Sequence, residues 1–254
     1  MKHLTVNGYD MAYLEVGKGP PLVCIHGSVG DFRSWAPVLG PLSARHRVIV
    51  PSLRHFFPEH WDGRGDTFTI DQHIADTIGF IEGLKLGPLD LMGHSRGGHI
   101  AFRVAQQRPD LLRRIVLAEP GGELDASLQP ADQPKPAQSM RERTVAAADR
   151  IKAGDIEGAL ESFIDGIDGP GAWTRKTPVE RQRVRDNAFT LIGQINEQRR
   201  LFSRADAEQI RTRTLFICGA RTKGSLPVVL RALAAHVKGS KTVLLDTTHP
   251  MMDQ

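Results

Sequence analysis

The stretch Leu89-Asp90-Leu91-Met92-Gly93-His94-Ser95-Arg96-Gly97-Gly98 decides the fold. It begins with a short apolar strand pattern and leads into a helical pattern, so its G-x-S-x-G pentapeptide falls at a strand-to-helix turn. Glycines on both sides of Ser95 remove Cβ atoms where the chain turns sharply, so a strained serine can expose its hydroxyl. The helix start favours negative charge, and the Arg96 amide would donate to an oxyanion. We therefore predict a nucleophilic serine at position 95.

Short strand patterns alternate with helical patterns on both sides of this stretch. We expect eight strands and four helices, the strands over residues 2–6, 11–16, 22–25, 47–50, 89–92, 115–118, 215–218 and 242–245, and the helices over 35–42, 70–84, 97–107 and 227–237. The first two strands form a hairpin around Asn7-Gly8, and the others have the spacing of βαβ units. This order predicts an α/β protein with a mostly parallel eight-stranded sheet flanked by helices.

Residues 123–212 break this rhythm. A polar, Pro-rich stretch over residues 129–136 precedes helical patterns over 141–153, 156–167 and 178–202. An insertion into one parent core explains this region more simply than an independent helical domain does, because the run is short and returns directly to a strand pattern at Leu215. We predict a helical cap inserted after the sixth strand, at residues 123–212, with residues 1–122 and 213–254 forming the core.

Composition excludes several classes of protein. The 254 residues carry a net charge of +4 and a pI near 9.3, but the Arg residues alternate with acids along helical patterns, which favours a solvated basic surface over nucleic-acid binding. We find no apolar run of bilayer-spanning length and no apolar signal core at the N-terminus, so we expect no membrane partner and a cytoplasmic location. Cys24 and Cys218 lie inside strand patterns, where small core residues are expected rather than a disulfide or metal site.

A second signal lies upstream, in Val23-Cys24-Ile25-His26-Gly27-Ser28, where a strand pattern enters a Gly-containing loop. With the G-x-S-x-G turn, the His26-Gly27 pair resembles the oxyanion loop of the α/β-hydrolase family. The resemblance is firm over about residues 21–118 and 215–249 and weak in the cap. It implies the α/β-hydrolase fold, a second oxyanion donor at the Ser28 amide, and a catalytic triad in the order serine, acid, histidine.

The base and the acid follow from this order. His249 ends the pattern after the last strand, and an imidazole has a pKa near neutrality that suits a general base. The commonest family pattern places an Asp after the strand at 215–218, where this sequence has Thr222 instead. Some subfamilies, including certain lactonases and dehalogenases, carry the acid after the preceding strand, which selects Glu119. Asp246 is the competing carboxylate.

The loop after the fourth strand departs from the Asp-x-x-Gly-x-Gly turn of many relatives. It is aromatic, and its Phe56, Phe57 and Trp61 either wall an apolar pocket beside the nucleophile or pack under the cap. Trp173 in the cap is a weaker candidate. The other pocket candidates are His26, Arg54 and His94.

The resemblance implies a cofactor-free and metal-free serine hydrolase that cleaves a carboxylic ester or lactone of a small organic substrate through an acyl-enzyme. Haloalkane dehalogenases and epoxide hydrolases of this fold use an Asp nucleophile, so Ser95 argues against both. Two alternatives stay open. One is a hydrolase of carbon–carbon bonds in vinylogous diketones, with Arg54 holding a second carboxylate, and the other is a non-catalytic ligand-binding member of the fold. A homodimer, and an extension of the native chain past Gln254, also stay open.

Overall fold

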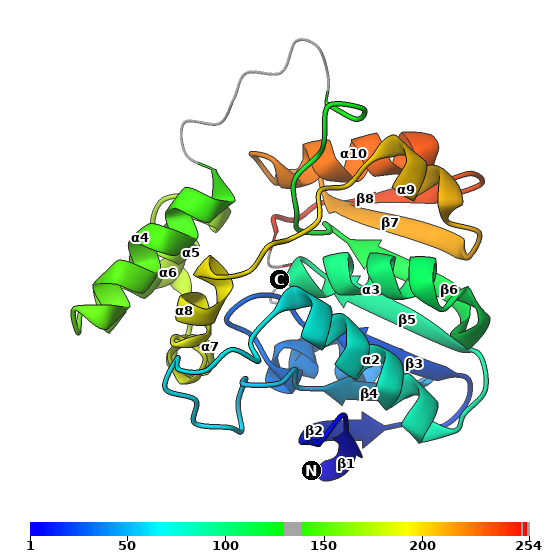
Figure 1. Cartoon of the computed structure of the whole chain (residues 1–254), viewed down its shortest axis with the longest axis horizontal. Coiled ribbons are helices and arrows are strands. Elements are labelled where there is room, and N and C mark those ends of the chain that lie inside the picture. Colours follow the sequence, from blue (N-terminus) through cyan, green and yellow to red (C-terminus); the bar gives the residue numbers. More distant parts are fainter. Residues whose placement is uncertain (130–138, 250, 253–254) are drawn as a thin grey trace.

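The computed structural model describes residues 1–129, 139–249 and 251–252. Eight strands form one sheet in the order β1-β2-β4-β3-β5-β6-β7-β8 (Figure 1). Their bounds are β1 (Lys2–Val6), β2 (Tyr9–Val16), β3 (Pro21–Ile25), β4 (Arg47–Pro51), β5 (Leu89–His94), β6 (Leu112–Ala118), β7 (Arg213–Gly219) and β8 (Lys241–Leu245). β2 pairs antiparallel with β1 and β4, and the other pairings are parallel. The predicted mostly parallel eight-stranded sheet is confirmed.

Helices cover both faces of the sheet, as a parallel sheet requires. They are α1 (Ala36–Ser43), α2 (Ile70–Leu84), α3 (Arg96–Gln107), α9 (Arg204–Gln209) and α10 (Leu226–His236). Side chains of β3 alternate between two cores: Val23 and Ile25 belong to the core shared with α2, α3 and α10, whereas Leu22 and Cys24 belong to the core on the opposite face with Trp35. Both cysteines are buried and free.

Five of the described helices between β6 and β7 pack on one another, and the sixth, α9, packs on the core. The five inserted helices are α4 (Met140–Lys152), α5 (Ile156–Asp168), α6 (Ala172–Arg175), α7 (Pro178–Asp186) and α8 (Thr190–Ile195). Figure 1 shows them grouped beside the sheet, and their apolar side chains form a separate buried cluster around Leu160, Phe163 and Leu191. Side-chain caps at Ser139, Asp155 and Thr177 mark where α4, α5 and α7 begin. Residues 130–136 of the Pro-rich stretch lie outside the described residues.

The helical pattern over residues 178–202 forms two short helices, α7 and α8, and the prediction of helix beyond Ile195 is wrong. The chain leaves helical geometry at Asn187, which is buried and whose side chain accepts a hydrogen bond from the Phe57 amide and donates to Asp31. These contacts with the core compete with a continued helix. Beyond α8 the chain becomes extended, and Phe202 pairs with Leu124.

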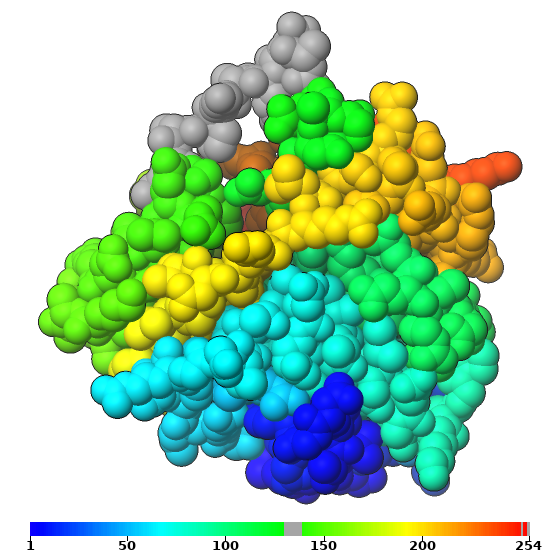
Figure 2. All heavy atoms as spheres, in the orientation of Figure 1, coloured from blue at the N-terminus to red at the C-terminus, as the bar shows by residue number. Residues whose placement is uncertain are grey.

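The return segment, residues 196–203, runs along the seam between the inserted helices and the core, as the yellow atoms of Figure 2 show. Phe202 is fully buried against Phe102 of α3, with ring centroids 5.0 Å apart. The α9 helix that follows packs against α10. The division at residues 123 and 212 stays a prediction. Among the described helices, none combines the length and the apolar character needed to cross a bilayer.

Candidate active site

Ser95 occupies the turn between β5 and α3 in a strained backbone conformation, with φ 53° and ψ −116°. Positive φ is uncommon for a residue with a side chain and persists only where neighbouring bonds hold it. The Ser95 amide donates to the Ala118 carbonyl over 3.0 Å, and the Ser95 carbonyl accepts from the amides of Gly98 and Gly121 at 2.9 and 2.8 Å. These bonds fix the turn from both sides, and the Ser95 side chain is left half-buried at the cavity wall.

Glycines around this turn are required by close backbone approach. A Cβ at Gly93 would lie 2.1 Å from the Gly97 carbonyl oxygen, and a Cβ at Gly97 would lie 2.1 Å from that of Ile25. A Cβ at Gly27 would lie 3.1 Å from the Ser95 Cβ. The loop after β3 therefore packs directly on the serine turn, which accounts for the G-x-S-x-G and His-Gly patterns together.

Glu119 and His249 meet at the carboxyl ends of β6 and β8. His249 Nδ1 donates to Glu119 Oε2 over 2.6 Å, and the Gly219 amide donates to Glu119 Oε1 over 2.8 Å. Burial acts to raise the pKa of Glu119, but the hydrogen bonds that it accepts outweigh burial and hold its pKa below the ordinary value. Asp246, the competing carboxylate, is 88% exposed and pairs with Arg221. Glu119 is thus the carboxylate that contacts His249.

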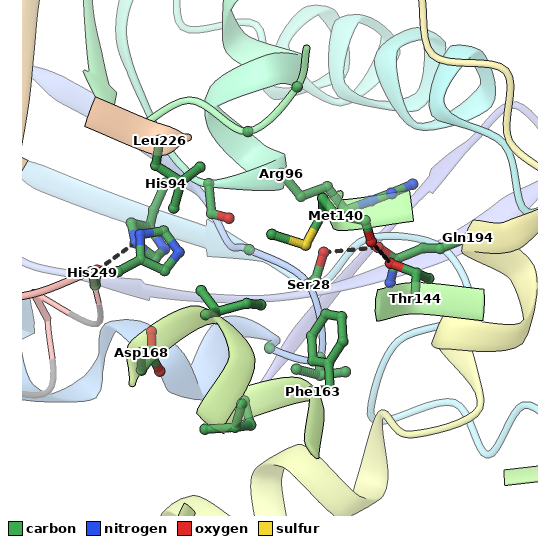
Figure 3. Close-up of a pocket in the computed structure, with 18 of the residues that line it drawn as sticks. Ser28, His94, Arg96, Met140, Thr144, Phe163, Asp168, Gln194, Leu226 and His249 are labelled. Atoms are coloured by element: carbon green, nitrogen blue, oxygen red, sulfur yellow. Dashed lines mark hydrogen bonds between the residues drawn. The ribbon is translucent and has the colours of Figure 1, made fainter. Parts of the chain in front are cut away.

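His94 supports the segment that carries His249. Its Nε2 donates to the His249 carbonyl over 3.0 Å, and the two rings stack with centroids 4.6 Å apart (Figure 3). Burial, followed by the neighbouring His249, lowers the pKa of His94 to about 3. His94 therefore stays neutral near pH 7 and acts as a fixed hydrogen-bond donor.

Ser95 and His249 open into the same cavity, which has a volume of about 400 Å³ and lies between the strand ends and the inserted helices. Part of its wall is apolar, from Val29, Met140, Phe163, Ile164, Ile167, Leu226 and Met252. Five cationic side chains also line it, Arg96, Arg141, Lys176, Arg183 and Arg199, against three carboxylates, Glu123, Asp168 and Glu197. The charged lining therefore carries a net charge of +2.

The amides of Ser28 and Arg96 are the predicted oxyanion donors, and both residues lie beside Ser95. Arg96 begins α3, and first-turn amides have no acceptor within their helix. Ser28 follows the glycine that approaches Ser95, and among the described residues no backbone acceptor is recorded for its amide. Both residues line the cavity.

One hydrogen-bonded network connects the side chains of these two residues through the chain from α8 to the return segment. Ser28 Oγ donates to Gln194 Oε1 over 2.8 Å, and Arg199 Nη2 donates to the same oxygen over 3.2 Å. Arg199 Nε and Arg96 Nη1 both donate to Glu197 Oε2, at 3.1 and 2.7 Å. The segment from Gln194 to Arg199 therefore ties the loop after β3 to the start of α3.

Two polar candidates from the sequence, His26 and Arg54, do not line the cavity. His26 is fully buried, accepts from the Leu53 amide at Nε2 over 3.0 Å and donates from Nδ1 to the Gly27 carbonyl. Burial lowers its pKa to about 4, so it acts as a neutral brace between two loops. Arg54 pairs bidentately with the buried Asp76, at 2.7 and 3.0 Å. Because its guanidinium is committed there, the prediction that Arg54 holds a substrate carboxylate is wrong.

The aromatic candidates pack under and within the inserted helices. Phe56 is fully buried against His26, and Phe57 packs on Phe32. Trp61 stacks on His55 and Phe68 and lies against Gly193 of α8, while Trp173 is buried among the inserted helices. None of these four belongs to the cavity lining of the described residues. The interpretation as packing under the cap is the correct one, because the rings fill the junction of core and insertion. His94 is the pocket candidate that does line the cavity.

Sequence reasoning missed the polar lining from the insertion. Gln194 contacts Ser28, and Glu197 contacts Arg96. Arg199 donates to both Gln194 and Glu197. The helical pattern over residues 178–202 gave no signal for them, because periodicity identifies an apolar face and not the partners of polar side chains.

Comparisons with known proteins agree with this fold. The (E)-2-((N-methylformamido)methylene)succinate hydrolase of Acinetobacter baylyi is 24% identical over an alignment of 253 residues that covers 97% of this chain and 89% of that enzyme. The 2-hydroxy-6-oxo-2,4-heptadienoate hydrolase of Pseudomonas putida is 34% identical over 114 residues, 43% of this chain and 41% of that enzyme. The solved structure of the enol-lactonase of Burkholderia xenovorans LB400 superposes with a TM-score of 0.78 at 22% identity, covering 98% of this chain and 93% of that one.

A family model described as the alpha/beta hydrolase fold matches residues 20–253, nearly the whole chain. It spans β3 to β8, the serine turn and the segment that ends in His249. The chain therefore belongs to the α/β-hydrolase family.

Proposed function

We propose that this protein is a serine hydrolase that cleaves an ester or lactone bond of a small organic substrate through an acyl-enzyme. The observation that carries the proposal is the shared cavity: a strained Ser95 and a His249 that is already paired with buried Glu119 both face it. A nucleophile, a base and an orienting carboxylate, which here follow β5, β8 and β6, are the parts that acyl transfer needs.

In this mechanism Ser95 Oγ attacks the substrate carbonyl while His249 Nε2 takes the hydroxyl proton. Glu119 accepts from His249 Nδ1, which fixes the imidazole tautomer and stabilises the imidazolium that forms. The amides of Ser28 and Arg96 donate to the oxyanion. The imidazolium then returns the proton to the leaving alkoxide, and a water molecule repeats the sequence to release the acid and free Ser95.

Hydrolysis of a carbon–carbon bond in a vinylogous diketone is the second candidate. The name of the Pseudomonas relative specifies a 2-hydroxy-6-oxo-dienoate, which favours this chemistry. The net positive cavity supports it as well, because such a substrate carries a carboxylate. A non-catalytic binding protein of the same fold would not depend on Ser95, and this separates it from both hydrolases.

The test is hydrolysis of 4-nitrophenyl butyrate, with the burst phase recorded, by the parent protein and three variants. Ser95→Ala should lower kcat by at least about 10³-fold, and Glu119→Gln by roughly 10⁴-fold because the histidine loses its carboxylate. Asp246→Asn is the matched control, since its carboxylate is exposed near His249, and should leave kcat unchanged.

Other outcomes redirect the assignment. A parent protein without Ser95-dependent hydrolysis of the ester argues against ester cleavage and leads to the dienoate substrates. Loss of activity in Asp246→Asn, with Glu119→Gln still active, would show that the acid is wrongly assigned.

A further inference from the structure

Gln194 contributes its side chain to the wall of the cavity, and the proposed mechanism does not use it. It lies on α8, its side chain lines the cavity, and the residue is only 8% exposed. In the view of Figure 3, Gln194 and Ser28 lie on the side opposite to His94 and His249. The Gln194 side chain is therefore separated from the histidines but joined to the loop that carries Ser28.

The orientation of the Gln194 amide is fixed by its neighbours. Arg199 Nη2 can only donate, so the atom that faces it over 3.2 Å must be the amide oxygen. Ser28 Oγ donates to the same oxygen over 2.8 Å. Gln194 Nε2 is therefore turned the other way, and it is buried without a hydrogen-bond partner among the residues that the structure describes. A buried amide donor without an acceptor is unfavourable and calls for a partner from outside the chain.

The charge around this donor is positive. The Glu197 carboxylate is shared by two guanidinium groups, Arg96 and Arg199, so one positive charge of this cluster is not neutralised within it. Burial and the neighbouring Arg96 lower the pKa of Arg199 from its ordinary value, and the Arg199 side chain stays 24% exposed. The cavity as a whole carries a net charge of +2. An anion is therefore the acceptor that suits both the donor and the field.

We propose that Gln194 Nε2 and Arg199 form a subsite for a carboxylate of the substrate, so that the protein acts on acidic esters or lactones in preference to neutral ones. The inference rests on the proposed function for the position of the scissile bond at Ser95. The substrate carboxylate would lie on the far side of Ser28 from Ser95, because Gly27, the residue before Ser28, packs directly against Ser95. A short carbon chain between the carbonyl and the carboxylate follows from this placement.

The test compares two esters of equal chain length, mono-4-nitrophenyl adipate and 4-nitrophenyl hexanoate. We expect the parent protein to show at least a tenfold higher kcat/KM for the adipate ester. Gln194→Glu keeps an acceptor for Ser28 and Arg199 but replaces the free donor with a negative oxygen, so the adipate/hexanoate ratio should fall at least tenfold. Arg199→Gln, which removes the cation, should lower the same ratio if Gln194→Glu fails to fold.

Gln107→Glu is the matched control, because Gln107 is exposed at the end of α3 and outside the cavity lining. Its ratio should equal that of the parent. Equal kcat/KM values of the parent for both esters, or an unchanged ratio in Gln194→Glu, would overturn the subsite while the serine mechanism stands.

If neither ester is cleaved, the proposed function fails, and calorimetric titration of the Ser95→Ala protein with adipate decides the subsite alone. Adipate should bind and adipamide should not, and Gln194→Glu in that background should weaken adipate binding at least tenfold. Equal binding of adipate and adipamide, or no binding of adipate, would reject the subsite.

Discussion

At the scale of single residues, the site depends on three glycines, which allow neighbouring atoms to pack where a side chain would not fit. Gly27, Gly93 and Gly97 each allow backbone or side-chain atoms to approach closer than a Cβ permits. Two of these contacts, at 2.1 Å, involve backbone carbonyls that cannot move aside. The Gly27 contact involves side-chain atoms at 3.1 and 3.3 Å, which can yield by a few tenths of an ångström. Gly27 is therefore the position where a substitution would disturb the geometry without preventing folding.

Gly27→Ala should lower kcat by at least about tenfold, because the new methyl group pushes against Ser95 Cβ and His94 Nδ1 and displaces the groups that must align. The melting temperature should fall only slightly. Steady-state hydrolysis of the preferred ester and differential scanning fluorimetry measure the two effects. Gly40→Ala in α1 is the matched control, since a Cβ there meets nothing within 4 Å, and it should change neither quantity by much. A fully active Gly27→Ala protein would contradict the tight packing between the loop after β3 and the serine turn.

At the scale of elements, the return segment connects the insertion to the serine turn through a buried ion pair. The side chains of Arg96 and Glu197 are at most 1% exposed. Removing one partner of such a pair leaves an uncompensated buried charge, which costs about 3–5 kcal/mol. Because Arg96 also carries the candidate oxyanion amide, this pair links stability to catalysis.

Glu197→Gln should therefore lower both the free energy of unfolding and kcat, the latter by at least tenfold. Asp206→Asn is the control. Asp206 of α9 pairs with Arg103 of α3, the helix that also carries Arg96. The two side chains are 1% and 4% exposed, but neither lines the cavity. This variant should lose comparable stability in urea unfolding while its kcat stays close to that of the parent. Equal loss of kcat in both variants would mean that general destabilisation, and not the position of Arg96, explains the effect.

The elements also show what sequence could and could not predict. Ser95, Glu119 and His249 each follow a strand, and the carboxyl ends of parallel strands meet at one edge, which explains why Glu119 reaches His249. The choice of this carboxylate and this histidine from the sequence depended on the resemblance to the α/β-hydrolase family. The inserted helices gave no such constraint, because periodicity identifies an apolar face but not which polar residues meet a neighbouring element. Gln194 and Glu197 were missed for this reason. The aromatic loop was ambiguous for a related reason, since a buried ring can either line a pocket or fill the junction between the core and the inserted helices.

At the scale of the whole molecule, four buried histidines surround the site region without being charged. Burial lowers the pKa of His26 to about 4 and that of His94 to about 3, and it holds those of His73 and His99 well below the ordinary value. In the unfolded chain each would titrate near 6.5. The unfolded state therefore binds more protons than the folded state below pH 6.5, so acid favours unfolding.

The free energy of unfolding should be nearly independent of pH above about 7.5 and fall steeply below 6.5. Each histidine contributes up to about 1.4 kcal/mol per pH unit, so four contribute roughly 5 kcal/mol per unit once the unfolded chain is fully protonated. Urea unfolding at pH 7.5, 6.5 and 5.5 measures this slope. His99→Gln, which removes one proton site, should reduce the slope by about a quarter whatever its effect on stability at pH 7.5. An unchanged slope in that variant, or a stability independent of pH down to 5.5, would show that these histidines take up protons in the folded protein.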